Sequence, residues 1–157
     1  MSKIAEIRRK KQDSYQGLNE LLSPLASGDW ERPIYGHGDG WVARDVLAHL
    51  VTAGAGLLQV AQLIVKGALR APPDFDLDRW NKRQVEKQAE LTPTELLNGL
   101  AALHERTLVY LDQLAADESV LDRRGQHAVF GDTSVEYVLR RIYRHEREHA
   151  QEIRAAL

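Results

Sequence analysis

The chain has no cysteine among its 157 residues, and this absence removes several classes of site at once. Disulfides, thiolate metal sites and cysteine nucleophiles are excluded, so histidines and carboxylates are the only strong metal ligands left. A cysteine-free chain is compatible with a reducing compartment but does not prove one. We expect a cytoplasmic protein, because the charged N-terminal segment has no apolar run of signal-peptide length.

An excess of charge of one sign is also missing. Lys and Arg number 21 against 23 Asp and Glu, which gives a net charge of −2. Because no basic field attracts nucleic acid, we expect no nucleic-acid partner, and we interpret the basic run Arg8–Lys11 as a solvated helix face. The most apolar stretch, 42–65, is interrupted by charged and polar residues, which favours a buried bundle helix over a membrane span.

Alternating apolar patterns of useful length are lacking too, so strands are at most incidental. Apolar residues instead recur at spacings of three and four, the period of an amphipathic helix. A short helix is expected over Leu77–Ala89. Long helices are expected from Ser2 to about residues 24–28, over Val42–Lys66, from Thr92 to about Ala116, and from Thr133 nearly to Leu157.

The helix boundaries carry recognisable signals. Thr92-Pro93-Thr94-Glu95 combines an N-cap hydroxyl, proline at the first helical position and glutamate at the third. Thr133-Ser134-Val135-Glu136 repeats the capping-box pattern before the last helix. Connecting segments separate the long helices at 29–40, 67–92 and 117–132, of which the first is turn-rich and the last is polar. The sequence therefore predicts an all-α four-helix bundle, in one domain over residues 1–157.

The last predicted helix contains His145-Glu146-Arg147-Glu148-His149. Two histidines four residues apart lie one helical turn apart, with Cβ atoms roughly 5–6 Å from each other. Their imidazoles can bind a single zinc ion at about 2.0–2.1 Å from each nitrogen. The same helix face carries Val138, Ile142 and Ile153, so we expect both histidines to point into the bundle.

His49 lies on the inward face of the helix expected over 42–66. A single histidine there is more often a hydrogen-bonded core residue than a ligand. Together with His145 and His149, however, it is best interpreted as the third ligand of one divalent ion. Three protein ligands leave a coordination position for water or substrate, the arrangement of catalytic metal sites. Three imidazoles suit zinc, nickel, copper and iron alike, so the residues do not select the metal.

The five residues 145–149 also match H-E-x-x-H, the zincin metalloprotease pattern in which the glutamate is the general base. Zincins take their third ligand downstream, and the eight residues that follow contain no histidine. We therefore do not favour protease chemistry. Glu146 is a weak candidate for contact with water on the metal, but it lies about 100° from His145 around the helix, and a solvated glutamate is the preferred interpretation.

Other polar and aromatic residues also have two possible roles. Asn81 is a second weak catalytic candidate, and Gln84 is similar; each can face the open metal position or form a polar helix face. We interpret His37 and His127 as solvent-exposed loop residues and His104 as a surface or boundary residue. Tryptophans at bundle ends are expected to be core aromatics: Trp30, Trp41 and Trp80.

Residues 40–50, GWVARDVLAHL, resemble the second helix of the DinB-like superfamily. Within that superfamily the chain is most similar to the metal-binding domains of mycothiol-dependent maleylpyruvate isomerases. In the superfamily a histidine on helix two joins an H-x-x-x-H pair on the last helix, and His49, His145 and His149 occupy those places. The segment Asp78–Asn81 also resembles a family element, and the similarity covers nearly the whole chain.

The resemblance implies an up-down-down-up bundle with a crossover between the second and third long helices. It also implies one divalent ion, zinc or nickel, often a homodimer, and a low-molecular-weight thiol such as mycothiol or bacillithiol as cosubstrate. The isomerases carry a further C-terminal domain beyond the matching one.

Three functions remain open from the sequence. In the leading hypothesis, the metal activates a thiol for transfer to a small electrophile, with the sulfur supplied by the cosubstrate. The first alternative is a small-molecule hydrolase that uses water activated by the metal. The second is a non-catalytic, stress-related metal-binding bundle. Each takes a small molecule or an ion as partner, and neither a membrane nor nucleic acid is expected.

Overall fold

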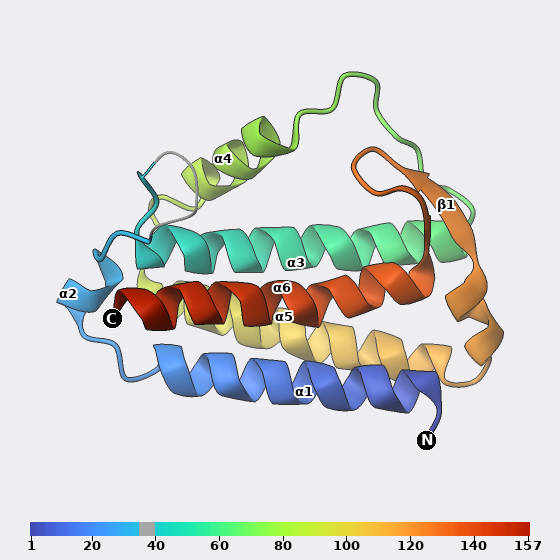
Figure 1. Ribbon diagram of the computed structural model, residues 1–157, viewed down its shortest axis with the longest axis horizontal. Coiled ribbons are helices and arrows are strands. Elements are labelled where there is room, and N and C mark those ends of the chain that lie inside the picture. Colours follow the sequence, from blue (N-terminus) through green and yellow to red (C-terminus); the bar gives the residue numbers. More distant parts are fainter. Residues whose placement is uncertain (35–39) are drawn as a thin grey trace.

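Four long helices form the body of the protein in the computed structural model, which describes residues 1–34 and 40–157. They are α1 (Lys3–Leu22), α3 (Ala43–Val65), α5 (Pro93–Leu114) and α6 (Val135–Ala156) (Figure 1). Shorter helical segments in the described residues connect them: α2 (Ser27–Trp30), α4 (Leu77–Lys87) and the 3₁₀ helix η2 (Glu118–Asp122). A small hairpin of β1 (Arg124–His127) and β2 (Gly131–Ser134) precedes α6, so strands are incidental, as predicted.

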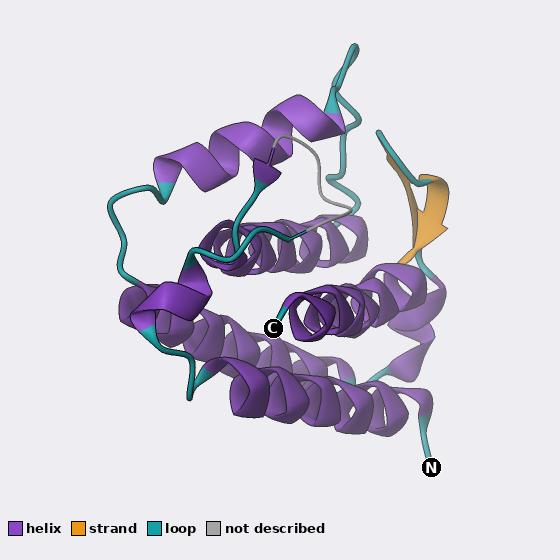
Figure 2. Cartoon of the chain, turned by 60° about the vertical axis from the view of Figure 1, so that its left-hand side comes forward, coloured by secondary structure: helices purple, strands orange, loops and turns teal. Residues whose placement is uncertain are grey.

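The long helices run up, down, down and up around the bundle (Figure 1). α6 packs against α1 and α3, and α5 packs against the same two helices from the other side. Neighbours α3 and α5 therefore run parallel, and so do α1 and α6 (Figures 1 and 2). A parallel pair cannot be joined by a tight turn, and residues 66–92 cross back along the bundle with α4 lying over α3. The predicted topology is confirmed.

Side-chain caps start α1, α5 and α6, with one correction to the sequence prediction, whereas the N-cap residue of α3, Val42, has no side chain that can accept a hydrogen bond. The Ser2 hydroxyl accepts from the Ala5 amide, and Thr92 and Glu95 form the predicted reciprocal capping box. For α6 the N-cap is Ser134, whose hydroxyl accepts from the Tyr137 amide. The prediction of a box starting at Thr133 was one residue early, because Thr133 is a buried residue within β2.

The crossover is fixed to the start of α3 by one arginine. The Arg44 guanidinium donates to the carbonyl oxygens of Gln88 and Leu91, in the segment that follows α4. The side chain of Arg44 is largely buried in doing so. This contact holds the segment between α4 and α5 beside the helix that carries His49.

The apolar helix α3 is the centre of the packing. Among the described residues it alone is long and apolar enough to cross a membrane by length and composition, a test that a core helix also passes. It packs against α4, α5 and α6, as the prediction of a bundle helix required. Gly54 allows the closest approach to α5, since a Cβ atom there would lie 2.7 Å from Cδ2 of Leu103.

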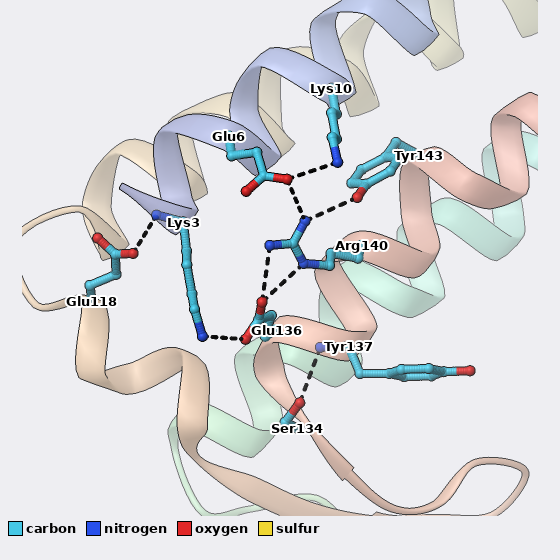
Figure 3. Close-up of polar contacts among 9 residues, drawn as sticks. All are labelled: Lys3, Glu6, Lys10, Glu118, Ser134, Glu136, Tyr137, Arg140 and Tyr143. Atoms are coloured by element: carbon cyan, nitrogen blue, oxygen red, sulfur yellow. Dashed lines mark hydrogen bonds and ion pairs between the residues drawn. The ribbon is translucent and has the colours of Figure 1, made fainter. Parts of the chain in front are cut away.

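Ion pairs join α1 to α6 at the end of the bundle nearest the hairpin (Figure 3). Arg140 contacts the carboxylates of Glu6 and Glu136 and the hydroxyl of Tyr143, and Lys3 contacts Glu136 at 3.1 Å. Hydrogen bonds from Lys10 and Arg140 lower the pKa of Glu6 to about 2. The charged residues of this network are half-buried or exposed, so the network differs from the buried polar groups described next.

Candidate metal centre

Three histidines from α3 and α6 converge between those helices. The Nε2 atom of His145 lies 3.0 Å from Nε2 of His49 and 2.8 Å from Nε2 of His149. His49 and His149 are buried and His145 is half-buried. The four-residue spacing on α6 stacks His145 and His149 one turn apart, and the antiparallel packing of α3 brings His49 opposite both.

The geometry of the three rings suits a single cation. One ligand atom from each ring lies within 4.8 Å of the others. Two nitrogens at tetrahedral positions around one zinc ion lie about 3.3 Å apart, close to the observed separations of 2.8 and 3.0 Å. The three ring planes lie at 78–88° to each other, so the rings meet edge to face and do not stack. The three side chains therefore form a group that can hold a metal ion.

A carboxylate supports one of these rings from behind. The Nδ1 atom of His149 lies 3.0 Å from a carboxylate oxygen of Glu152, one turn further along α6. A histidine that donates its Nδ1 proton to a carboxylate presents Nε2 as the ligand and becomes a better donor to a metal. Glu152 was not predicted to have this role. Its spacing of three residues from His149 was the signal for this supporting role.

Glu146 is the main correction to the predicted site. It is buried, not solvated, and its carboxylate points away from the three histidines toward α1. There it lies 2.8 Å from Nζ of Lys11 and accepts a hydrogen bond of 2.7 Å from the Ser14 hydroxyl. The interpretation of Arg8–Lys11 as a solvated face is therefore wrong for Lys11, which is 1% exposed.

His104 is also part of this second cluster. The prediction that it is a surface or boundary residue is wrong. The residue is buried, its Nδ1 atom lies 3.0 Å from Nζ of Lys11, and its ring stacks on Tyr15. Burial, with a smaller contribution from the nearby positive charge of Lys11, lowers the pKa of His104 to about 4. Burial also lowers the pKa of Lys11, and the Glu146 carboxylate opposes that shift. A neutral His104 therefore accepts a hydrogen bond from Lys11, whose charge Glu146 balances.

The remaining candidates lie in different places. Asn81 and Gln84 are half-buried on α4, and their roles stay predictions. The prediction of an exposed His127 is only partly right, because this residue is half-buried, stacks on Phe130 and accepts from two backbone amides of the hairpin turn. His37 lies outside the described residues.

The tryptophans are divided between core and site. Trp30 is buried, as predicted, whereas Trp41 and Trp80 are half-buried. The Trp41 ring lies 5.1 Å from the His49 ring, and the Trp80 ring packs against α3 at Gly56. One tryptophan thus flanks the candidate metal centre, and another attaches α4 to the helix that carries His49.

Comparisons with solved structures give the same fold at low sequence identity. YfiT from Bacillus subtilis, a probable metal-dependent hydrolase with an unusual four-helix bundle topology, is 20% identical with a TM-score of 0.77; the match covers 99% of this chain and 87% of that chain. The mycothiol-dependent maleylpyruvate isomerase is 16% identical with a TM-score of 0.71, and this chain spans 60% of its length. The colibactin self-resistance protein ClbS, solved with double-stranded DNA, is 11% identical with a TM-score of 0.75 and coverages of 97% and 94%.

A search among curated proteins found no match. The sequence itself matches the family model of the DinB superfamily over residues 12–153, which include all three histidines. This match extends over most of the chain and agrees with the resemblance carried by residues 40–50 and by the H-x-x-x-H pair. The chain belongs to the DinB superfamily.

Proposed function

We propose that this protein is a metal-dependent enzyme in which His49, His145 and His149 hold one divalent ion and leave room on it for a small molecule. The convergence of three Nε2 atoms from two helices carries the proposal. Zinc or nickel is the proposed ion, in keeping with three imidazole ligands. When bound, such an ion lowers the pKa of a thiol or a water that occupies its open position.

The proposed reaction is transfer of a low-molecular-weight thiol to a small electrophile. The position of Glu146 favours a thiol over water as the nucleophile. In H-E-x-x-H hydrolases the glutamate removes a proton from water, but here that carboxylate is paired with Lys11 on the other side of α6. A thiol has a far lower pKa than water and is deprotonated on coordination without a neighbouring base.

The residues of the chain have distinct parts in this proposal. His149 is oriented by Glu152, so that its Nε2 atom faces the shared centre. Trp41 lies beside His49, with the two ring centroids 5.1 Å apart. The sulfur comes from the cosubstrate, since the chain has no cysteine. A mycothiol-dependent enzyme among the structural neighbours supports this choice.

Hydrolysis of a small molecule is the second candidate. Its support is the similarity to YfiT, a probable metal-dependent hydrolase, which this chain covers over 87% of its length against 60% for the isomerase. A non-catalytic metal-binding bundle is the third alternative. Cytoplasmic location and a homodimer remain predictions that accompany each of them.

The test is an activity matrix on protein loaded with zinc or nickel. A fluorogenic bimane electrophile is offered with mycothiol, with bacillithiol and with no thiol, and a nitrophenyl ester is offered without thiol. We expect turnover only with a thiol. His149→Ala is expected to lose both the bound metal and the activity, whereas the matched control His127→Ala, on the hairpin, keeps both. Ester turnover without thiol would select hydrolysis instead, and full activity of His149→Ala would refute the proposed centre.

A further inference from the structure

We propose that the buried Lys11–Glu146 pair is a positioning element for the candidate metal centre, which fixes the rotation of α6 so that His145 and His149 face His49. The inference rests on the metal binding assumed in the proposed function. Neither Lys11 nor Glu146 is offered as a ligand or as a group that touches substrate.

The pair belongs to a closed polar cluster that joins three helices. Glu146 on α6 contacts Lys11 at 2.8 Å and Ser14 at 2.7 Å, both on α1, and Lys11 contacts His104 on α5 at 3.0 Å. The Ser14 hydroxyl also lies 3.2 Å from the carbonyl oxygen of Tyr143, on α6 itself. All four side chains are at most 7% exposed. Water therefore contributes little to satisfying them, and their geometry has to be met by the protein.

The position of Glu146 next to His145 makes this cluster sensitive to the rotation of α6. Consecutive residues on a helix point about 100° apart, so His145 and His149 face α3 while Glu146 faces α1. A side-chain tip lies about 5–6 Å from the helix axis, and a rotation of about 20° moves it by about 2 Å. That displacement would break contacts of 2.7–2.8 Å on one flank and would separate the Nε2 atoms on the other.

Apolar packing alone specifies this rotation less sharply. The buried aliphatic face of α6, with Val138, Ile142 and Ile153, makes contacts that have no preferred direction. A buried charge that loses its partner, in contrast, is strongly unfavourable. One rotational setting satisfies the pair, and that setting also directs both α6 histidines at His49.

The test measures cobalt binding, not activity. The double variant Lys11→Met/Glu146→Leu replaces both charges with apolar side chains of similar length and is expected to keep its helix content. We expect its affinity for Co²⁺ to fall about tenfold or more, as for other groups that orient metal ligands, and the visible spectrum of bound Co²⁺ to change. The neighbouring variant Lys10→Met, which loses only the surface pair with Glu6, is the matched control and keeps the wild-type affinity and spectrum.

Ser14→Ala is the milder variant for the case in which the double variant does not fold. It removes one hydrogen bond to Glu146 and leaves the ion pair, and we expect cobalt binding to weaken by a few-fold with no loss of helix content. Wild-type affinity and spectrum in the folded double variant, or in Ser14→Ala if only that variant folds, would overturn the inference and leave the proposed function standing. A wild-type chain that binds no Co²⁺ would overturn both.

Discussion

Helix α6 carries a polar cluster on each of two flanks, and the clusters differ in how their charge is balanced. Toward α1 and α5, Lys11 and Glu146 neutralise each other, and Ser14 and His104 complete their hydrogen bonds. Toward α3, three imidazoles of the same chemical type bring their Nε2 atoms together. In the first cluster the charges of Lys11 and Glu146 balance each other. The second cluster consists of three imidazoles, which together can hold a cation.

The histidines and the glutamate of one sequence motif therefore have separate roles. In residues 145–149 the histidines face one flank and the glutamate faces the other. The motif thus resembles that of a metalloprotease in its letters, but its glutamate supports the fold and does not face the shared histidine centre. Breaking each cluster separately tests this division.

The largest effect on stability is expected from a change in the cluster that contains Lys11 and Glu146. Glu146→Leu leaves the Lys11 ammonium in the core without its carboxylate, and we expect the free energy of unfolding to fall by about 3–5 kcal/mol. Urea unfolding of metal-free protein measures the change. The double variant Lys11→Met/Glu146→Leu is expected to recover most of it, because a buried pair can be replaced by apolar side chains at little cost. If Glu146→Leu alone were as stable as wild type, the Lys11–Glu146 pair would not be the charge-balanced cluster that distinguishes this flank of α6 from the other.

The next largest effect is expected at Glu152, which contacts His149 in the three-histidine cluster. Glu152→Ala removes the carboxylate that orients His149 and is expected to weaken metal binding by about ten- to a hundredfold. Competition with a metallochromic chelator measures the affinity. Glu148→Ala, one turn earlier on α6, loses only the exposed pair with Arg141 and is the matched control. Equal affinities of the two variants would remove Glu152 from the site.

A pH series distinguishes the clusters through His104. Its pKa is lowered from 6.5 to about 4 in the folded protein, so the unfolded chain binds a proton there between these values and the folded chain does not. Stability is therefore lost as the pH falls through this window, and His104→Gln should remove that part of the loss. Between about pH 7 and about pH 5 we expect the wild type to lose about 1–2 kcal/mol more than the variant. Urea unfolding of the metal-free proteins measures this difference. If the free energy of unfolding fell by the same amount in wild type and in His104→Gln, the pH dependence would not come from His104.

The smallest effect is expected outside both clusters. Lys3→Ala removes an exposed contact to Glu136 at the end of the bundle (Figure 3), and pairs in open solvent contribute little. The urea midpoint should not move measurably, and metal affinity should be unchanged. A clear loss of stability would show that the surface network matters as much as the buried one.

Local signals explain how much of this arrangement was predictable. The helical period, the cap at Thr92 and the spacing of His145 and His149 are all properties of neighbouring residues, and the structure reproduces each of them. The topology followed from the family resemblance and from a connection between α3 and α5 that is too long for a tight turn.

The buried polar partners were not predictable by the same reasoning. Lysine and glutamate are seldom fully buried, and a helix considered alone places Glu146 away from the histidines, in apparent solvent. The burial of Glu146 depends on α1, which is 132 positions away from it at Ser14. A tertiary contact over that separation leaves no local pattern, so Lys11, Ser14 and His104 appear only when the helices are assembled.

The parallel pair α3 and α5 has a consequence for how this protein can vary. The connection it requires supplies α4, an eleven-residue helix that is laid across the bundle and has only Val85 buried. Exchanging its outward residues leaves the main core intact, and surface changes of this kind seldom alter stability by more than about 0.5 kcal/mol. Changes in α3 or α6 would disturb core and histidines together. The architecture thus separates a frame in which substitutions disturb both the core and the histidines from a strip beside it that tolerates substitution.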